Sequence, residues 1–239
     1  MKLTKVTFTG VDEKTDLDHL QEIGKKYPYV EFGVLMSYNW PWNGPRFPNP
    51  QRICKELRNR GLQLSAHFCG EMAIDIARGE TSKTICGYGG DLDIFRRCQL
   101  NLQANGMFAT LRHVKPFMLC DEVIIQMHTP ELFQEFLKGK LPQNASYLLD
   151  ASGGRGIDTP IEIVTSPNVH IGYAGGIGVD NVEKKLRTLL DYDSPEKFWI
   201  DMETRVRTDD EWLDLEKVEK VLEICDPIIK EYRNHEENE

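Results

Sequence analysis

The chain has 239 residues, of which 40% are hydrophobic and 28% are charged, and its formal net charge is −9. This composition excludes an intrinsically disordered chain, and the excess of acidic groups argues against a protein that coats nucleic acid. No uncharged apolar run approaches the roughly 18 residues of a membrane span, and the first residues lack the apolar stretch of a signal peptide. We therefore expect a globular cytoplasmic protein with no nucleic-acid or membrane partner.

Short strands rich in β-branched residues alternate with helical patterns along the chain. The predicted strands are residues 5–9, 30–36, 63–67, a segment within 98–103, 122–127, 146–150, 169–174 and 198–202. The predicted helices are residues 14–27, 50–60, one that begins near residue 70, 107–119, 130–137, a short one at 160–165, 179–190 and 215–232. The polar tail at residues 234–239 is expected to be disordered.

Eight strand–helix units in 239 residues (239/8) give about 30 residues per unit, which is the size of a βα unit. The strands are short and apolar, as parallel strands buried on both faces should be, and closing eight of them removes every unpaired edge. No linker divides the chain. We therefore predict one domain, a (β/α)8 barrel. The alternative, an open doubly wound sheet, lacks its usual Gly-x-Gly-x-x-Gly after the first strand, where residues 9–12 read Thr-Gly-Val-Asp.

In such barrels the chemistry takes place at the carboxyl ends of the strands. The candidate catalytic residues at the predicted strand ends are Thr9, His67, His128 and Asp150. The two histidines have ordinary pKa values suited to proton transfer near neutral pH, although each is as well explained by a structural hydrogen bond. The six cysteines are irregularly spaced and form no zinc-binding pattern, so we expect free thiols, no metal site and no cofactor.

Two glycine-rich turns are the strongest local signal. Gly153, Gly154 and Gly156 follow the predicted sixth strand, and Gly175 and Gly176 follow the seventh. Glycines let the backbone approach a ligand closely, and the start of a helix favours a bound phosphate. After the eighth strand, Thr204 offers a hydroxyl group and Arg205 a cation. These features predict a phosphorylated small-molecule ligand; the alternative is that the glycines only make tight turns.

Four segments stand in a characteristic order. Residues 7–11 read Thr-Phe-Thr-Gly-Val, 147–150 read Tyr-Leu-Leu-Asp ahead of the first glycine-rich turn, 173–177 read Tyr-Ala-Gly-Gly-Ile, and 200–206 read Ile-Asp-Met-Glu-Thr-Arg-Val. They resemble the phosphoribosylanthranilate isomerase family, which has Lys-Ile-Cys-Gly-Leu, Leu-Leu-Asp, Leu-Ala-Gly-Gly-Leu and Val-Asp-Val-Ser-Ser-Gly-Val at these places. The resemblance implies a (β/α)8 barrel that isomerises a phosphoribosylamine by an Amadori rearrangement without a cofactor.

The resemblance also implies residue roles. Asp150 would be the general acid, and Arg46, in the long loop at residues 37–49, would contact a carboxylate of the ligand. The family's general base is a cysteine, but Thr9 stands there, and a hydroxyl group is too weak a base to replace a thiolate. The base would then come from His67, Cys69 or His128.

Two further departures affect the eighth strand. Glu203 and Arg205 stand where the family has Ser and Gly, so Arg205 would either pair with a phosphate or fill its pocket. We therefore keep three possibilities open: an isomerase-like enzyme, an inactive barrel that binds a phosphorylated ligand, and a metal-dependent sugar-phosphate epimerase. The last would use His67, His128, Asp150 and Glu203 together. The oligomeric state is expected to be a monomer or a homodimer.

Overall fold

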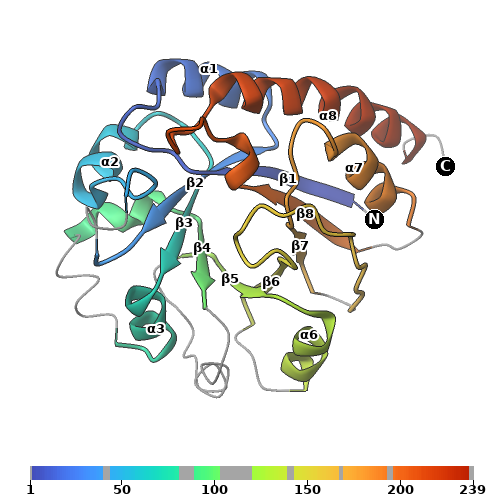
Figure 1. Ribbon diagram of the computed structural model, residues 1–239, viewed down its shortest axis with the longest axis horizontal. Helices are drawn as coiled ribbons and strands as arrows, with labels where there is room; N and C mark the ends of the chain where they lie inside the picture. Colours follow the sequence, from blue (N-terminus) through green and yellow to red (C-terminus); the bar gives the residue numbers. More distant parts are fainter. Residues whose placement is uncertain are drawn as a thin grey trace.

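The computed structural model describes residues 2–39, 44–80, 89–102, 120–138, 143–166, 169–192 and 196–236. Its centre is a closed barrel of eight parallel strands in chain order (Figure 1). The strands are β1 (Lys2–Thr9), β2 (Val30–Met36), β3 (Leu64–Cys69), β4 (Arg97–Asn101), β5 (Glu122–Met127), β6 (Ala145–Leu149), β7 (Ile171–Tyr173) and β8 (Lys197–Met202). Strand β1 pairs with both β2 and β8, which closes the ring.

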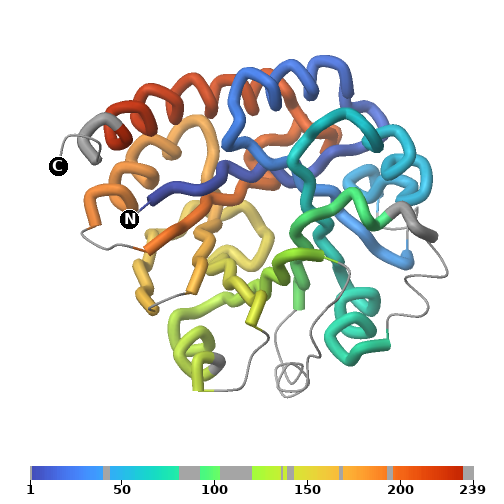
Figure 2. The backbone as a smooth tube through the Cα atoms, turned by 180° about the vertical axis from the view of Figure 1, so that it is seen from behind, coloured from blue at the N-terminus to red at the C-terminus, as the bar shows by residue number. Residues whose placement is uncertain are grey.

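Helices lie around the outside of this barrel. They are α1 (Leu17–Lys26), α2 (Pro50–Leu57), α3 (Glu71–Ala77), α6 (Pro130–Leu137), α7 (Val182–Leu190) and α8 (Leu215–Glu236), with short 3-10 helices η1 (Gly89–Ile94) and η2 (Thr204–Val206). Seen from behind, α7 and α8 run side by side near both chain ends (Figure 2). The prediction of a single (β/α)8 barrel is confirmed. Among the described residues, no helix has the length and apolar character needed to cross a bilayer.

Two local predictions were wrong. Residues 156–166 have no regular structure where a short helix was expected at 160–165, because this segment combines Pro160 with β-branched residues that disfavour a helix. Helix α8 continues to Glu236, so the first part of the expected tail is helical; no Gly or Pro stops the helix after Tyr232. The predicted helix at 107–119 and residues 237–239 lie outside the described residues.

The two faces of the barrel strands differ in polarity. Side chains that point toward the helices, such as Val6, Phe8 and Phe32, belong to the large apolar core. The barrel interior instead contains buried polar side chains: Thr7, Thr9, Glu31, Ser65, His67, Arg97, Gln99, Gln126, Ser146, Asp150 and Asp201. Its apolar part is a small separate cluster of Ile124, Leu148 and Trp199. Barrel interiors are commonly filled by branched apolar residues, so this interior has an unusual capacity for hydrogen bonding and proton transfer.

Candidate functional site

A cavity of about 430 Å³ opens at the carboxyl ends of the strands. Its lining includes all fourteen candidate residues that the sequence analysis named: Thr9, Arg46, His67, Cys69, His128, Asp150, Gly153, Gly154, Gly156, Gly175, Gly176, Glu203, Thr204 and Arg205. The barrel explains this convergence, because each residue follows or ends a strand and the carboxyl ends of the strands share one mouth. The volume suits a small-molecule ligand. What each residue does in binding or catalysis stays a prediction.

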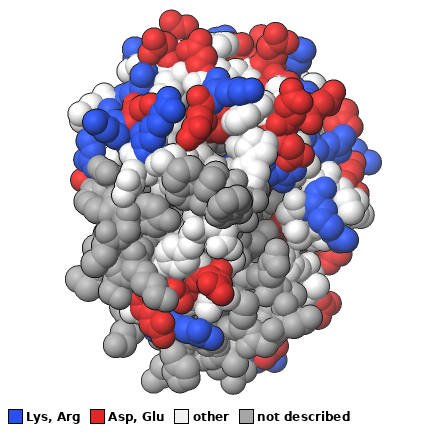
Figure 3. Space-filling model, turned by 60° about the vertical axis from the view of Figure 1, so that its left-hand side comes forward, with Lys and Arg blue, Asp and Glu red and all other residues white. Residues whose placement is uncertain are grey.

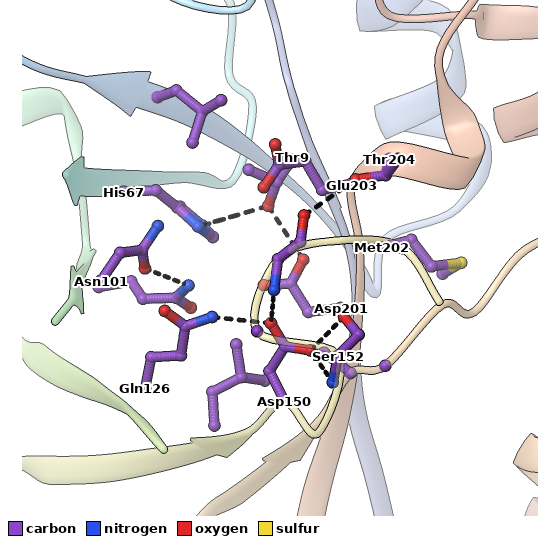
Figure 4. Close-up of a pocket in the computed structure, with 18 of the residues that line it drawn as sticks. Thr9, His67, Asn101, Gln126, Asp150, Ser152, Asp201, Met202, Glu203 and Thr204 are labelled. Atoms are coloured by element: carbon purple, nitrogen blue, oxygen red, sulfur yellow. Dashed lines mark hydrogen bonds between the residues drawn. The ribbon is translucent and has the colours of Figure 1, made fainter. Parts of the chain in front are cut away.

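The deepest part of the cavity holds a short chain of hydrogen bonds (Figure 4). Thr9 Oγ1 donates to Asp201 Oδ1 at 3.0 Å and lies 3.4 Å from His67 Nε2, which is itself 3.0 Å from Ser65 Oγ. Gly33 of β2 leaves the room for this chain, since a Cβ there would lie 2.6 Å from Thr9 Oγ1 and 2.8 Å from His67 Nε2. Burial, reinforced by the charge of Arg97, lowers the pKa of His67 to about 3. His67 is therefore neutral at physiological pH and orients Thr9.

Asp201 is the buried carboxyl group at the end of this chain. Only 6% of the residue is exposed, and it lines the cavity. Burial raises the pKa of Asp201 well above its ordinary value, and the nearby charge of Glu203 adds to the shift. The hydrogen bond from Thr9 works in the opposite direction. A carboxyl group of this kind retains its proton at a pH where an exposed aspartate has lost it.

Glu203, two residues further along β8, lies among cations. Its Oε1 is 3.2 Å from Arg46 Nη1 and 3.8 Å from Arg207 Nη2. Burial raises the pKa of Glu203, while the guanidinium groups of Arg207 and Arg46 favour the charged form. Two carboxyl groups on one strand thus have different surroundings: Asp201 is held by a hydroxyl group, and Glu203 by two cations.

Asp150 also lies in the cavity, where it fixes the first glycine-rich turn. Its Oδ1 accepts from the backbone N–H and the hydroxyl group of Ser152 at 3.1 and 2.7 Å, and its Oδ2 accepts from Gln126 Nε2 at 2.8 Å and Gly154 N at 2.6 Å. An ionised carboxylate has about four lone-pair sites, and four donors occupy them here. The geometry therefore supports Asp150 as the residue that positions the loop at 150–154, because three of these four donors belong to the loop itself.

The glycines of the two turns lie at one corner of the mouth with Thr204 and Arg205. Thr204 Oγ1 donates to the carbonyl of Gly154 at 3.3 Å, and a Cβ at Gly156 would lie 2.6 Å from the Thr204 Cβ. Arg205 donates to the carbonyl of Gly176 at 3.0 Å and to Asp180 Oδ2 at 2.6 Å. The side chain of Arg205 thus already has a carbonyl and a carboxylate as partners, in the region where a phosphate was expected.

The glycines after β7 also allow another part of the chain to approach. A Cβ at Gly176 would lie 2.4 Å from the backbone of Ile157, and one at Gly175 would lie 2.4 Å from Thr159 Oγ1. Lys185 of α7 joins these segments, with its Nζ 2.7 Å from the carbonyl of Thr159 and 2.9 Å from that of Gly175. Close packing of the β6–β7 segment is one demonstrated reason for glycine at both positions.

Arg46 joins the long loop to the segment after β8. It pairs with Glu203 and with Glu211, so protein carboxylates occupy the guanidinium group that was expected to contact a ligand carboxylate. Glu211 has a left-handed backbone with φ of 71°, which is strained for a residue other than glycine, and its carbonyl also accepts from Arg207 Nη1 at 2.7 Å. One strained residue therefore holds both arginines beside Glu203.

The candidate bases other than His67 have different surroundings. Burial raises the pKa of the Cys69 thiol to about 12, so the thiolate is not available near neutral pH. His128 is partly buried and its Nδ1 lies 3.2 Å from the carbonyl of Asp150. In the part of the chain that the structure describes, no group of three or more His, Cys, Asp or Glu side chains could hold a metal ion. The four residues that a metal-dependent epimerase would need therefore do not form a metal site.

Asp201 is the functional candidate that the sequence analysis did not single out. Its only signal was position, a carboxylate two residues before Glu203 in an otherwise apolar strand, which strand alternation places on the same face as Glu203. Gln99, Asn101 and Gln126, which also line the cavity, had no signal beyond their polarity.

Solved structures with a similar fold include two isomerases and an epimerase. N-(5'-phosphoribosyl)anthranilate isomerase from Pyrococcus furiosus matches with a TM-score of 0.56 and 16% identity over 94% of this chain and 99% of its own. The phosphoribosyl anthranilate isomerase from Thermococcus kodakaraensis matches with a TM-score of 0.53 and 12% identity over 93% and 98%. D-psicose 3-epimerase from Clostridium cellulolyticum H10 matches with a TM-score of 0.50 and 11% identity over 98% and 99%.

These likenesses show the (β/α)8 fold and do not decide an activity, because one fold hosts many chemistries. No family model matches the sequence, and neither does any curated protein. The resemblance to the phosphoribosylanthranilate isomerases in motif order therefore stays a prediction.

Proposed function

We propose that this barrel isomerises a phosphorylated sugar or sugar–amine conjugate by proton transfer, with Asp201 as the general acid and Glu203 as the general base. The observation that carries the proposal is the pair of carboxyl groups at the end of β8, one on the strand and one directly after it, both in the cavity and both with raised pKa values. Efficient acid–base catalysis needs one group that holds its proton and another that can accept one near the working pH. Different surroundings of two neighbouring carboxyl groups provide such a division of roles.

The reaction is an aldose–ketose rearrangement. Glu203 takes the proton from the carbon next to the carbonyl or imine carbon, while Asp201 gives its proton to the carbonyl oxygen or imine nitrogen. The resulting enediol or enaminol then receives the first proton on the neighbouring carbon, and its hydroxyl proton returns to Asp201. Thr9 keeps Asp201 oriented, and His67 keeps Thr9 oriented. Arg46 and Arg207 beside Glu203 would stabilise its charge at the start and end of each cycle.

For the phosphate group we propose the corner formed by Gly153, Gly154, Gly156, Gly176 and Thr204. Its support is that the loop fixed by Asp150 and the turn after β7 meet Thr204 at one corner of the cavity, since glycines let an anion approach the backbone closely and a rigid turn binds it at little cost in entropy. The N–H groups of Gly153 and Gly154 already donate to Asp150, so they hold the turn in place. Arg205 would add a positive charge once its bond to Asp180 lengthens.

Hydrogen exchange into the substrate tests this function directly. The protein is incubated in D2O with ribose 5-phosphate, ribulose 5-phosphate and N-(5'-phosphoribosyl)anthranilate, and NMR follows both product formation and deuterium at the carbon next to the carbonyl. We expect exchange and turnover of at least one of them, and a loss of about 10²- to 10⁴-fold in Asp201→Asn and in Glu203→Gln. The control is Asp121→Asn, which removes an exposed carboxylate that pairs with Arg96 outside the cavity.

The alternative of an inactive ligand-binding barrel predicts a different pattern. In that case a sugar phosphate binds, no exchange or turnover occurs in the wild type, and Asp201→Asn leaves the affinity unchanged. Full activity in both β8 variants would overturn the assignment of the two carboxyl groups.

A further inference from the structure

A second, smaller cavity of about 170 Å³ lies beside the first. His128 and Ala174 line both cavities, so they form a common wall. The imidazole ring of His128 also lies close to the glycine-rich turn, since a Cβ at Gly153 would be 3.8 Å from it. A ligand in the main cavity that extends past His128 would therefore enter the second one.

The absence of regular structure in residues 156–166 explains why this space exists. In a regular (β/α)8 barrel a helix covers the strands at this position, whereas here an irregular segment lies over β6 and β7. Long irregular segments in compact domains often serve binding. The Tyr173 hydroxyl group donates to the carbonyl of Val164 at 3.0 Å and accepts from the Val164 N–H at 3.4 Å. Because the hydroxyl group is bound in this way, it is the aromatic ring of Tyr173 that faces the cavity.

The lining combines apolar side chains with two carboxylates at the opening. Its apolar members are Pro130, Leu149, Ala151, Pro160, Ile161 and Tyr173. Ile157, on the same segment, is 51% exposed, which is unusual for such a large apolar side chain in this protein. The charged members are Glu131 and Glu162, both exposed at the rim. The remaining lining residues are His128, Thr129 and Ala174. The carboxylates of Glu131 and Glu162 disfavour an anion at the opening and tolerate a neutral or cationic group.

We propose that the second cavity binds an uncharged or cationic apolar substituent, of the size of one aromatic ring, carried by the sugar that occupies the main cavity. The inference rests on the proposed function, because the sugar is what links the two cavities. The size is sufficient: an apolar cavity of about 150 Å³ in a protein interior can bind benzene. A substituent that carries a carboxylate would be rejected by Glu131 and Glu162.

The first part of the test uses three rings of matched size and different charge. Benzyl alcohol, benzylamine and benzoate are titrated into the ¹⁵N-labelled protein, and the amide shifts of His128, Ala151, Ile161 and Ala174 are followed. We expect benzyl alcohol and benzylamine to bind with millimolar affinity at these residues, and benzoate to bind at least tenfold more weakly. Equal binding of benzoate, or shifts confined to other regions, would overturn the proposed chemistry of the cavity.

The second part uses a variant that fills the cavity. Ala151 is exposed on the turn and lines the cavity, so Ala151→Leu should reduce the affinity for benzyl alcohol at least tenfold without harming the fold. Gln134→Leu, which adds the same side chain on the exposed surface of α6, is the matched control and should change nothing. An unchanged affinity in Ala151→Leu rejects the site.

The third part links the ring to the sugar. The conjugate 1-(benzylamino)-1-deoxyribulose 5-phosphate should bind the wild type at least tenfold more tightly than ribulose 5-phosphate, and Ala151→Leu should reduce the ratio of the two affinities to about one. If ribulose 5-phosphate binds and the conjugate has no advantage, this inference falls and the proposed function stands. If a ring binds but no sugar phosphate does, the proposed function falls, and with it the link between the two cavities.

Discussion

Carboxyl groups have pKa values shifted in opposite directions at the two ends of the barrel interior. At the amino ends of the strands, Arg97 lies 2.8 Å from Glu31 and 3.1 Å from Glu122, and His170 lies 2.9 Å from Glu122. Burial alone would raise the pKa of Glu122, but the hydrogen bond from His170 and the charge of Arg97 lower it to about 2. At the carboxyl ends, burial raises the pKa of Asp201, and the hydrogen bond from Thr9 and the charge of Arg97 do not offset the shift.

Under the proposed function, the two ends of the barrel interior serve different purposes: the amino ends stabilise the fold and the carboxyl ends carry out the reaction. Every charge of the cluster at the amino ends has a partner of opposite sign, so the cluster can only hold strands together. The carboxyl ends hold Asp201 and Glu203, whose pKa values are raised by burial. The proposed acid–base catalysis requires such groups, and their burial costs stability. Charged surface side chains of both signs are interspersed outside the barrel (Figure 3), so the division concerns the interior.

The largest expected effect comes from breaking the cluster at the amino ends. Arg97→Met should lower the free energy of unfolding by about 3–5 kcal/mol, because Glu31, which is 1% exposed, loses its cation. Urea denaturation at neutral pH measures the change. Arg96→Met is the control, since Arg96 is exposed and should contribute less than about 1 kcal/mol. A loss below about 1 kcal/mol for Arg97→Met would show that the cluster does not stabilise the barrel.

Stability measured as a function of pH should respond in opposite directions to the carboxyl groups at the two ends of the barrel interior. Glu122 has a folded-state pKa of about 2, below its ordinary 4.5, so it stabilises the fold above pH 4.5 by up to about 3 kcal/mol and loses this contribution as the pH falls toward 2. Asp201 has a raised folded-state pKa, so its favourable contribution is present at low pH and is lost as the pH rises.

Two variants show in which direction each carboxyl group changes the stability. At neutral pH, Glu122→Gln should be less stable than the wild type and Asp201→Asn more stable, and both differences should shrink in acid. Thermal unfolding between pH 2 and pH 8 provides the measurement. The comparison fails if both variants shift stability in the same direction.

A smaller effect is expected from Asp150→Asn. The amide cannot accept all four hydrogen bonds that the carboxylate accepts, so the variant should lose about 1–3 kcal/mol of stability and show faster amide exchange at residues 150–154. If instead stability and exchange are unchanged while turnover disappears, Asp150 is the general acid that the sequence resemblance implied.

An effect of similar size on stability, with a second readout in the reaction, is expected at Gly33. Gly33→Ala places a methyl group against Thr9 and His67 and should cost about 1–3 kcal/mol through overpacking, with a shifted pH–rate profile because Asp201 loses its oriented partner. Gly24→Ala, where the added methyl meets the flexible end of Leu62, is the matched control and should leave the profile unchanged. An unaltered pH–rate profile in Gly33→Ala would show that Thr9 does not influence the reaction.

The sequence predicts the fold and the location of the site because both follow from repetition. Once eight strands are recognised, closure of the barrel brings residues as distant as Thr9, Asp150 and Thr204 to one mouth. The roles could not be predicted in the same way. Whether a carboxyl group carries a proton depends on neighbours from other strands, such as the Thr9 hydroxyl group that donates to Asp201, and no local pattern encodes these neighbours.

The second glycine-rich turn illustrates the same limit. A glycine pair before a helix is the pattern of a phosphate site, but here the backbone of residues 157–158 lies against Gly176 and the side chain of Thr159 lies against Gly175. The irregular backbone of that segment determines how the glycines pack. Periodicity in the sequence could not predict this backbone, because β-branched residues next to a proline fit no regular pattern.

A titration of the side-chain carboxyl groups by ¹³C NMR tests the central claim most directly, with Asp201→Asn and Glu122→Gln assigning the two signals. The account predicts that Asp201 titrates well above the ordinary range of an aspartate, while Glu122 remains charged down to about pH 2. An Asp201 signal that titrates at or below its ordinary pKa would contradict the division of the barrel interior and the assignment of Asp201 as the acid.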